Sequence, residues 1–253
     1  MPFHNPIKAK FQTNQPVINA WLTFPDAVTA EVMAQAGYDS LTVDVQHGLM
    51  DYQGALAQIQ ALSAAHAPVM ARVAWNEPSQ IMKLLDAGAL GIVCPMVNTR
   101  AEAEAFVGAC RFAPQGYRSY GPSRMALYHG DSYFQNANAE LLTIAMIETA
   151  QALDNVEAIV ATPGLDAVYI GPSDLSISLG YPPNVEPTDP TLVAAIDRIL
   201  RAAQQAGRAA CLHCRTPEYA KAALARGFNL VTLNTDFGIL RAASLALLEA
   251  VRS

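Results

Sequence analysis

The chain has 253 residues, of which 52% are hydrophobic and 15% charged, which suits one barrel-sized domain or two small ones. A net charge of −6 without a basic stripe argues against nucleic acid as a partner, and no apolar run approaches the roughly 20 residues of a membrane span. The opening MPFHNPIKAK lacks the apolar core of a signal peptide, and four cysteines make no disulfide framework, so a cytoplasmic location is predicted.

Short apolar runs alternate along the chain with longer alanine-rich segments that have helical spacing. The runs predict eight strands, at residues 17–24, 39–46, 68–75, 90–97, 141–149, 165–172, 208–214 and 229–236. The segments between them predict helices, for example at residues 26–37, 51–65, 77–88, 190–207 and 216–227. Eight such units predict a (β/α)8 TIM barrel that forms a single domain over residues 1–253, with a doubly wound open sheet as the alternative.

Two segments fall outside this alternation. Residues 111–138 form the longest stretch without regular periodicity, which is too long for a simple connection and is expected to cover or line a site. Residues 237–253 predict a strongly apolar helix, which would close the barrel or pack on a neighbouring subunit.

The residues that end the predicted strands are the candidates for chemistry, because barrel enzymes carry their active sites at the C-terminal ends of the strands. An ionisable group there must be paired, ligated or solvated, since burying it alone is costly. The polar residues found at these ends are Asp44, Gln46, His47, Arg72, Glu148, Asp174, His213 and Asp236.

Glu148 and Asp174 end consecutive predicted strands, so their carboxylates are expected to lie side by side. Two adjacent carboxylates repel each other unless a proton or a cation intervenes. A hard cation such as Mg²⁺ or Mn²⁺, held by both carboxylates, waters and a chelating substrate, would remove this repulsion, whereas zinc would normally have more His or Cys ligands. The spacing is equally compatible with a structural interpretation, in which Glu148 caps a helix and Asp174 pairs with an arginine.

Arg72 lies in an otherwise apolar predicted strand, so its guanidinium must meet an anion. One interpretation is a structural salt bridge to Asp44 or Glu148. The other is a clamp on a substrate carboxylate, for which the planar guanidinium is well suited. An anion beside a cation held by two carboxylates would make a site for a 2-oxo acid.

The stretch VYIGPSDLSISLG, residues 168–180, joins a short apolar run to a polar turn. Gly171 allows the backbone to approach another group closely. Ser173 or Asp174 is expected to cap the next helix, whose free amides would then point toward a ligand.

His47 lies at the mouth of the second predicted strand, between Gln46 and Gly48. A single histidine is more often a surface or capping residue than a catalyst, and strand alternation puts Asp44 on the opposite face from it. Asp86, in the segment KLLDAG, is another candidate partner, although its position on a predicted helix is that of an ordinary polar-face residue.

The segment CLHC ends the seventh predicted strand and contains a C-x-x-C pair. No second pair lies at zinc-binding spacing, so we expect core packing, with Cys211 and His213 on one face of the strand, Cys214 on the other, and His213 near the rim. Asp236, at the end of the eighth predicted strand, is expected to be a helix N-cap.

Together, VDVQHG, ARVAW, LLDAGALGIVCPMV, MIET and GLDAVYIGPSDLSISLG resemble the class II, metal-dependent pyruvate aldolases of the HpcH/HpaI aldolase and citrate lyase superfamily. The similarity is to the 4-hydroxy-2-oxoheptanedioate and 2-dehydro-3-deoxyglucarate aldolase type. It covers residues 19–236, and GPSDLS with an upstream ET is its most specific part. It implies a divalent metal, Mg²⁺, Mn²⁺ or Co²⁺, and a homo-hexamer built as a trimer of dimers that exchange the terminal helix.

The resemblance also implies roles for individual residues. Glu148 and Asp174 match the two metal-binding carboxylates. Arg72 matches the arginine that holds the pyruvyl group and stabilises its enolate oxygen. His47 matches the histidine that transfers a proton, and Asp86 matches the aspartate that pairs with this histidine.

Three further positions match substrate-binding elements, and one departs from the family pattern. Gly171 and Ser173 fall where backbone amides meet the pyruvate carboxylate, and Trp21 is a further candidate substrate-binding residue. Gln46 stands where many members have Glu, which changes the charge beside the base and is expected to affect the choice of aldehyde without removing a ligand.

The predicted function is reversible aldol cleavage of 4-hydroxy-2-oxo acids into pyruvate and a small aldehyde, through a metal-stabilised pyruvate enolate. A Schiff-base aldolase is disfavoured, because a catalytic lysine would stand at a strand end and none of the four lysines does, namely Lys8, Lys10, Lys83 and Lys221. Two alternatives are an acyl-CoA thioester lyase of the same superfamily, which should have a larger basic surface, and a non-catalytic metabolite-binding barrel, which is weakened because no matched site residue is missing.

Overall fold

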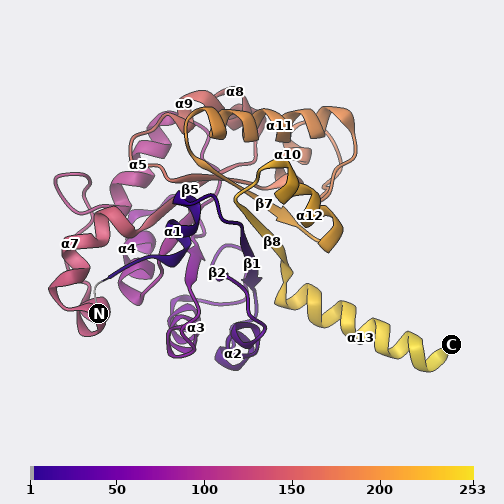
Figure 1. Ribbon diagram of the computed structural model, residues 1–253, viewed down its shortest axis with the longest axis horizontal. Helices are drawn as coiled ribbons and strands as arrows, with labels where there is room; N and C mark the ends of the chain where they lie inside the picture. The colour runs from indigo at the N-terminus through magenta and orange to yellow at the C-terminus, as the bar shows by residue number, and fades with distance from the viewer. Residues whose placement is uncertain (1–2) are drawn as a thin grey trace.

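A computed structural model describes residues 3–253. Its eight strands pair in parallel, in sequence order, and the last pairs with the first to close a barrel (Figure 1). The predicted (β/α)8 TIM barrel is therefore confirmed, and the alternative open sheet is wrong. The strands are β1 Val17–Leu22, β2 Ser40–Asp44, β3 Val69–Arg72, β4 Gly91–Cys94, β5 Leu142–Ile147, β6 Ala167–Ile170, β7 Ala209–Cys214 and β8 Leu230–Thr235.

Helices between the strands cover the outside of the barrel (Figure 1). Many begin at capping side chains that the sequence supplies: Asp51, for example, accepts a hydrogen bond from Gly54 N, and Thr99 forms a capping box with Glu102. The helices are α1 Pro6–Gln12, α2 Ala27–Gln35, α3 Tyr52–Ala64, α4 Pro78–Ala87, α5 Arg100–Cys110, α6 Ser123–His129, α7 Asp131–Glu140, α8 Ala150–Asp154, α9 Val156–Val160, α10 Pro172–Ser178, α11 Pro190–Gln205, α12 Pro217–Arg226 and α13 Asp236–Arg252.

The core has two layers, because successive residues of a strand face opposite sides of the sheet. Met70 packs with the cluster inside the barrel, whereas its neighbour Ala71 packs with the cluster between the sheet and the helices. In β7, Cys211 faces the interior while Cys214 belongs to the outer layer, as expected for core packing. Side chains fill the interior, so any ligand must bind at an end of the barrel.

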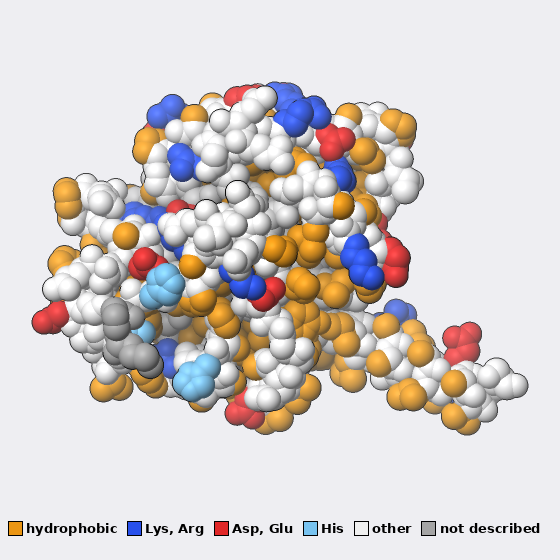
Figure 2. All heavy atoms as spheres, in the orientation of Figure 1, with side chains coloured by type: hydrophobic (Ala, Val, Ile, Leu, Met, Phe, Trp, Pro, Cys, Tyr) orange, Lys and Arg blue, Asp and Glu red, His pale blue; other side chains and the backbone are white. Residues whose placement is uncertain are grey.

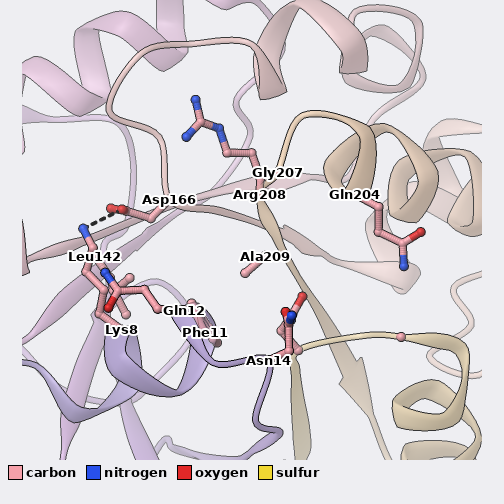
Figure 3. Close-up of a pocket in the computed structure, with 12 residues that line it drawn as sticks. Lys8, Phe11, Gln12, Asn14, Leu142, Asp166, Gln204, Gly207, Arg208 and Ala209 are labelled. Atoms are coloured by element: carbon pink, nitrogen blue, oxygen red, sulfur yellow. Dashed lines mark hydrogen bonds and ion pairs between the residues drawn. The ribbon is translucent and has the colours of Figure 1, made fainter.

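Helix α1 closes the N-terminal end of the barrel, where Ile7 packs into the interior cluster. Beside this helix lies a cavity of about 410 Å³ at the starts of β5, β7 and β8. Lys8 and Asp166 form an ion pair in its wall (Figure 3), with Nζ 2.7 Å from Oδ1. An active site is not expected at this N-terminal end, because barrel enzymes carry their active sites at the opposite end.

The segment 111–138 is irregular only over residues 111–122, so the expectation from the sequence is wrong for its second part. It contains α6 and most of α7, which meet at Gly130, a residue with φ +57°. The buried side chains of these helices are few, so neither helix has the apolar periodicity that marks the longer helices.

Helix α13 projects from the barrel instead of covering it (Figure 1). Its contacts are with β1 and β8, near its start, and Asp236 is its one buried residue. Hydrophobic side chains lie along its exposed length (Figure 2), among them Leu245, Leu248 and Val251. No helix in the described part of the chain is long and apolar enough to cross a membrane. The predicted apolar terminal helix is present, with its apolar surface facing solvent.

Candidate active site

A cavity of about 230 Å³ opens at the C-terminal ends of the strands. Its lining includes three carboxylates, one guanidinium, two imidazoles and the aromatic rings of Trp21 and Tyr169. Seven of the eight site residues predicted from the sequence line it, namely Trp21, His47, Arg72, Glu148, Gly171, Ser173 and Asp174. The eighth, Asp86, does not line this cavity.

Arg72 is held in one orientation by Asp44 and Trp21. Asp44 and Arg72 are register partners at the ends of β2 and β3, and Arg72 Nε and Nη2 donate to Asp44 Oδ1 and Oδ2 at 2.8 and 2.7 Å. The guanidinium carbon lies 3.9 Å from the centre of the Trp21 ring. The third nitrogen, Nη1, makes no hydrogen bond within the described residues and remains free for a substrate anion. The structural salt bridge from Arg72 to Asp44 is therefore present. It orients the guanidinium, whose free edge could bind a substrate carboxylate.

Glu148 directly follows β5, and its side chain is buried, with 2% of the residue exposed. Its Oε1 accepts a hydrogen bond from Met96 N at 2.8 Å, and Met96 has φ +55°, a left-handed conformation that non-glycine residues seldom adopt. Burial raises the pKa of the Glu148 carboxyl to about 7, and the charge of Asp174 adds to this rise against the effects of Met96 N–H and Arg72. Loss of its proton would therefore be favoured by a cation.

Asp174 faces the same cavity from the first turn of α10. Glu148 caps no helix, because the N-cap of α8 is Thr149, and no arginine pairs with Asp174 within the described residues. The structural interpretation of the two carboxylates is therefore wrong. No group of three His, Cys, Asp or Glu side chains in residues 3–253 could hold a metal. Two carboxylates, with waters and substrate oxygens completing the shell, do fit a hard divalent cation such as Mg²⁺.

Helix α10 begins without a side-chain cap, contrary to the expectation for Ser173 or Asp174. Its N-cap is Gly171, and the helix starts at Pro172. The amides of Ser173 and Asp174 lie in the first turn, where no intrahelical acceptor exists. A Cβ on Gly171 would clash with Glu148 Oε2, so the close approach that the sequence predicted for Gly171 is made to the carboxylate.

His47 follows β2 and lies exposed at the mouth of the cavity. Its backbone N–H donates to Asp44 Oδ1 at 3.3 Å, while its ring makes no hydrogen bond within the described residues. The neighbouring Gln46 has a buried Oε1 without a hydrogen-bond partner among those residues. The imidazole is thus positioned by the turn at Asp44 and is free to reach a substrate.

Asp86 lies apart from His47, with which it makes no hydrogen bond or ion pair in the described structure. It sits on α4, where Oδ1 is 2.5 Å from Nη2 of the buried Arg118. It lines a separate cavity of about 610 Å³, between α3, α4 and α6. Residues of α6, such as Arg124 and Tyr128, line this cavity together with Asp86, so part of the segment 111–138 does line a cavity, as expected.

A network of hydrogen-bonded side chains lies beneath the cavity, and the sequence predicted only one of its members, His213. The Tyr169 hydroxyl donates to Thr232 Oγ1 at 2.7 Å and lies 3.1 Å from His213 Nδ1. Asn19 lies next to Thr232, and the Trp21 ring packs edge-on against His213 with their centres 5.3 Å apart. His213 is at the rim, as predicted. Tyr169, Thr232 and Asn19 were missed, because inward-facing polar residues on apolar strands carry no local signal of their partners.

Asp236 is not an N-cap, which corrects the sequence prediction by one residue. The N-cap of α13 is Thr235, whose Oγ1 accepts from Gly238 N at 3.0 Å. Asp236 is the first residue of the helix and accepts from the backbone and hydroxyl of Thr23 at 2.8 and 2.6 Å. Its carboxylate ties the end of β1 to the start of α13.

None of the four lysines reaches the cavity at the strand ends. Lys8 and Lys10 lie on α1, Lys83 on α4 and Lys221 on α12. A Schiff-base mechanism would need an amine at the substrate carbonyl, so the prediction from the sequence agrees with the arrangement found.

Comparisons with known proteins agree with this geometry. The model of the HpcH/HpaI aldolase/citrate lyase family matches residues 18–243. A hydroxypyruvate/pyruvate aldolase of Rhizorhabdus wittichii is 37% identical over 249 residues, which cover 98% of this chain and 99% of the relative. A 4-hydroxy-2-oxo-heptane-1,7-dioate aldolase of Shigella sonnei is 34% identical over 246 residues, covering 96% and 93%.

Solved structures show the same architecture. The crystal structure of an HpcH/HpaI aldolase/citrate lyase family protein from Burkholderia cenocepacia superposes with a TM-score of 0.92 at 33% identity, covering 98% of this chain and all of that one. The barrel architecture is thus shared with this solved structure.

Proposed function

This chain belongs to the HpcH/HpaI aldolase/citrate lyase family, and we propose that it forms and cleaves 4-hydroxy-2-oxo acids, releasing pyruvate and a small aldehyde. Its relatives are named aldolases, and the chain is accordingly a carbon–carbon lyase. An acyl-CoA thioester lyase is less well supported, because the relatives reported above are aldolases. The observation that carries the proposal is the meeting of Glu148, Asp174 and Arg72 in one cavity at the strand ends.

The residues divide the work of binding between two sides of the cavity. Glu148 and Asp174 would hold a divalent cation, Mg²⁺, Mn²⁺ or Co²⁺, which when bound supplies Lewis acidity toward the 2-oxo acid. Arg72 would bind the oxygens of the pyruvyl group through its free Nη1 edge. The amides of the first turn of α10, at Ser173, would meet the carboxylate, and Trp21 would support the guanidinium from below.

Cleavage breaks the bond between C3 and C4 of the aldol. The 4-hydroxyl proton passes to His47, directly or through a water, and the C4–O bond becomes the carbonyl of the aldehyde. The electron pair of the broken bond remains on the pyruvate half as an enolate, whose oxygen is stabilised by the charge of Arg72. Protonation of C3 then gives pyruvate. In the reverse direction the same residues form the enolate and join it to an aldehyde.

Proton exchange at the methyl group of pyruvate tests this function without a choice of aldehyde. The methyl signal is followed by NMR in D₂O with the protein and Mg²⁺, and again after a chelator is added. We expect exchange that requires the metal, because the enolate is formed and quenched with solvent deuterium. The Asp174→Asn variant should abolish exchange, whereas Asp131→Asn, an exposed carboxylate on α7, should retain it. Absence of exchange with every divalent metal would refute the proposal.

We further propose that the chain works as a homo-hexamer, a trimer of dimers, in which Asp86 pairs with His47 of a neighbouring copy. Two observations support assembly: the unpaired apolar side chains of α13, and the separation of Asp86 from His47 within one chain. An exposed His47 on one copy and an open cavity beside Asp86 on another are compatible with such a contact. The cytoplasmic location stays a prediction.

A further inference from the structure

The reaction proposed above gives no role to His213, although this side chain is part of the site. His213 stands at the end of β7 and lines the same cavity as Arg72 and Glu148. It is half-buried, and its ring packs edge-on against Trp21. It is not a third metal ligand, because no group of three such side chains in residues 3–253 could hold a metal. Its contacts define another task.

The indole of Trp21 fixes the direction of a chain of hydrogen bonds that ends at His213. A buried indole N–H needs an acceptor, and Trp21 Nε1 finds one in Asn19 Oδ1 at 3.1 Å when the amide is oriented to satisfy its neighbours. In that orientation Thr232 Oγ1 also donates to Asn19 Oδ1, at 3.0 Å. The Tyr169 hydroxyl then donates its only proton to Thr232, so its oxygen must accept from His213 Nδ1 at 3.1 Å.

This direction decides the tautomer of His213. Burial, followed by the charge of Arg72, lowers the pKa of His213 to about 4, so the ring is neutral near pH 7. A neutral ring with its proton on Nδ1 has a lone pair on Nε2. Nε2 has no hydrogen-bond partner within the described residues, yet it is not enclosed by them, so it opens into the cavity that His213 lines.

We propose that His213 Nε2 accepts a hydrogen bond from a substrate hydroxyl, and that the enzyme thereby favours hydroxylated substrates over their deoxy counterparts. The inference rests on the proposed aldol function. The hydroxyl has two sources, the 2-oxo acid (hydroxypyruvate in place of pyruvate) or the aldehyde (glycolaldehyde in place of acetaldehyde). An anionic group is disfavoured at this position, because Nε2 offers a lone pair and Arg72, already paired with Asp44, is the only Lys or Arg among the described residues lining the cavity.

The test measures kcat/KM for matched substrate pairs in the wild type and in His213→Leu. One arm compares hydroxypyruvate with pyruvate at a fixed aldehyde, and the other compares glycolaldehyde with acetaldehyde at fixed pyruvate. We expect the preference for the hydroxylated partner to fall about tenfold in one arm, which is the loss of one hydrogen bond. The arm that responds identifies the source of the hydroxyl.

Two variants separate recognition from a merely structural role. His213→Gln supplies an amide oxygen that can accept the same bond, so it should restore most of the lost preference. Tyr169→Phe removes the acceptor for Nδ1–H and should lower the preference while His213 remains in place. The tautomer is read independently from the ¹⁵N chemical shifts of His213, which should show a proton on Nδ1 in the wild type.

Each outcome decides the inference. An unchanged preference in both arms of His213→Leu overturns it, and so does an equal loss on hydroxylated and deoxy substrates, since that reports only damage to the site. A proton on Nε2 in the wild type also overturns it. If the wild type catalyses no reaction with any pair, the proposed function fails; if it is active but its preference ignores His213, this inference fails alone.

Discussion

The carboxylate of Glu148 occupies the space that a side chain at Gly171 would fill, because a Cβ there would clash with Glu148 Oε2. We therefore expect Gly171→Ala to displace one proposed metal ligand and to weaken binding of Mg²⁺ or Mn²⁺ by about 10- to 100-fold. Isothermal titration with Mn²⁺ measures this directly. Gly121→Ala is the matched control, since nothing lies within 4 Å of its added methyl group. Equal affinities in both variants would contradict the assignment of Glu148 as a ligand.

The raised pKa of Glu148 predicts how stability depends on pH without metal. Its value of about 7 exceeds the ordinary 4.5, so the folded chain binds more protons than the unfolded chain between these values. Stability should therefore fall as pH rises from 4.5 to 7, by about 3 kcal/mol at most. Bound divalent metal should remove the loss, because it replaces the proton.

Chemical unfolding at several pH values, in chelator and in Mg²⁺, measures this dependence. His213 has the opposite effect, since its lowered pKa makes the folded state lose stability as pH falls below 6.5. The Glu148→Gln variant lacks the ionisable carboxyl. The free energy of unfolding of the wild type, minus that of this variant, should therefore fall as pH rises from 4.5 to 7. A difference that stays flat from pH 5 to 8 would count against the raised pKa.

Arg72→Lys tests whether the orientation of the guanidinium matters as well as its charge. Lysine keeps the charge beside Asp44 but loses the two-pronged pairing and the stacking on Trp21. We expect kcat/KM for aldol cleavage to fall about 100-fold, with the fold retained. Arg100→Lys, on an exposed ion pair of α5, should leave activity unchanged. Full activity in Arg72→Lys would show that a point charge suffices.

Mixing two inactive variants tests the pairing of Asp86 with His47 between copies. His47→Ala and Asp86→Asn should each have little activity, because each lacks one member of the proposed pair. If the pair forms across subunits, unfolding and refolding the two together should restore activity, since some sites then contain both native residues. A mixture that stays as inactive as its components would place the pair inside one chain or dismiss Asp86 from catalysis.

The exposed apolar side chains of α13 predict that charged substitutions on this helix will disrupt the proposed hexamer. Leu245 and Leu248 are 50% and 52% exposed, and burying them against another copy would stabilise the assembly. Changing both to Glu should shift the mass in sedimentation equilibrium toward the single chain. Lys221→Glu, on the exposed surface of α12, serves as the control. A monomeric wild type would rule out the hexamer.

The strands were predictable because parallel strands buried on both faces appear as continuous apolar runs. The residues at their ends were predictable for the same reason, since Glu148 and Arg72 stand out against such runs. The partner of Arg72 was not predictable, because the sequence allows a salt bridge to Asp44 as well as to Glu148. The register between β2 and β3, which sets Asp44 opposite Arg72, decides it.

Other misses arise from contacts that the sequence cannot express. The helices α6 and α7 escaped prediction because their buried faces are small and Gly130 divides them. The capping of α10 by Gly171 was missed because Ser173 and Asp174 are better capping residues in isolation. Asp86 meets Arg118 across 32 residues, a pairing that helical periodicity does not reveal.

The hydrogen bonds behind the cavity floor also bear on how the chain folds. Asn19 and Thr232 are 213 residues apart in the sequence and meet only when β8 pairs with β1. Such long-range contacts form slowly during folding, because a long loop must close first. A barrel that closes out of register would leave the indole of Trp21 without an acceptor and the tautomer of His213 undetermined. Correct closure of the barrel and the proposed recognition of the substrate hydroxyl thus both depend on the hydrogen bonds of Asn19 and Thr232. A barrel closed in the wrong register would therefore also lose its substrate preference.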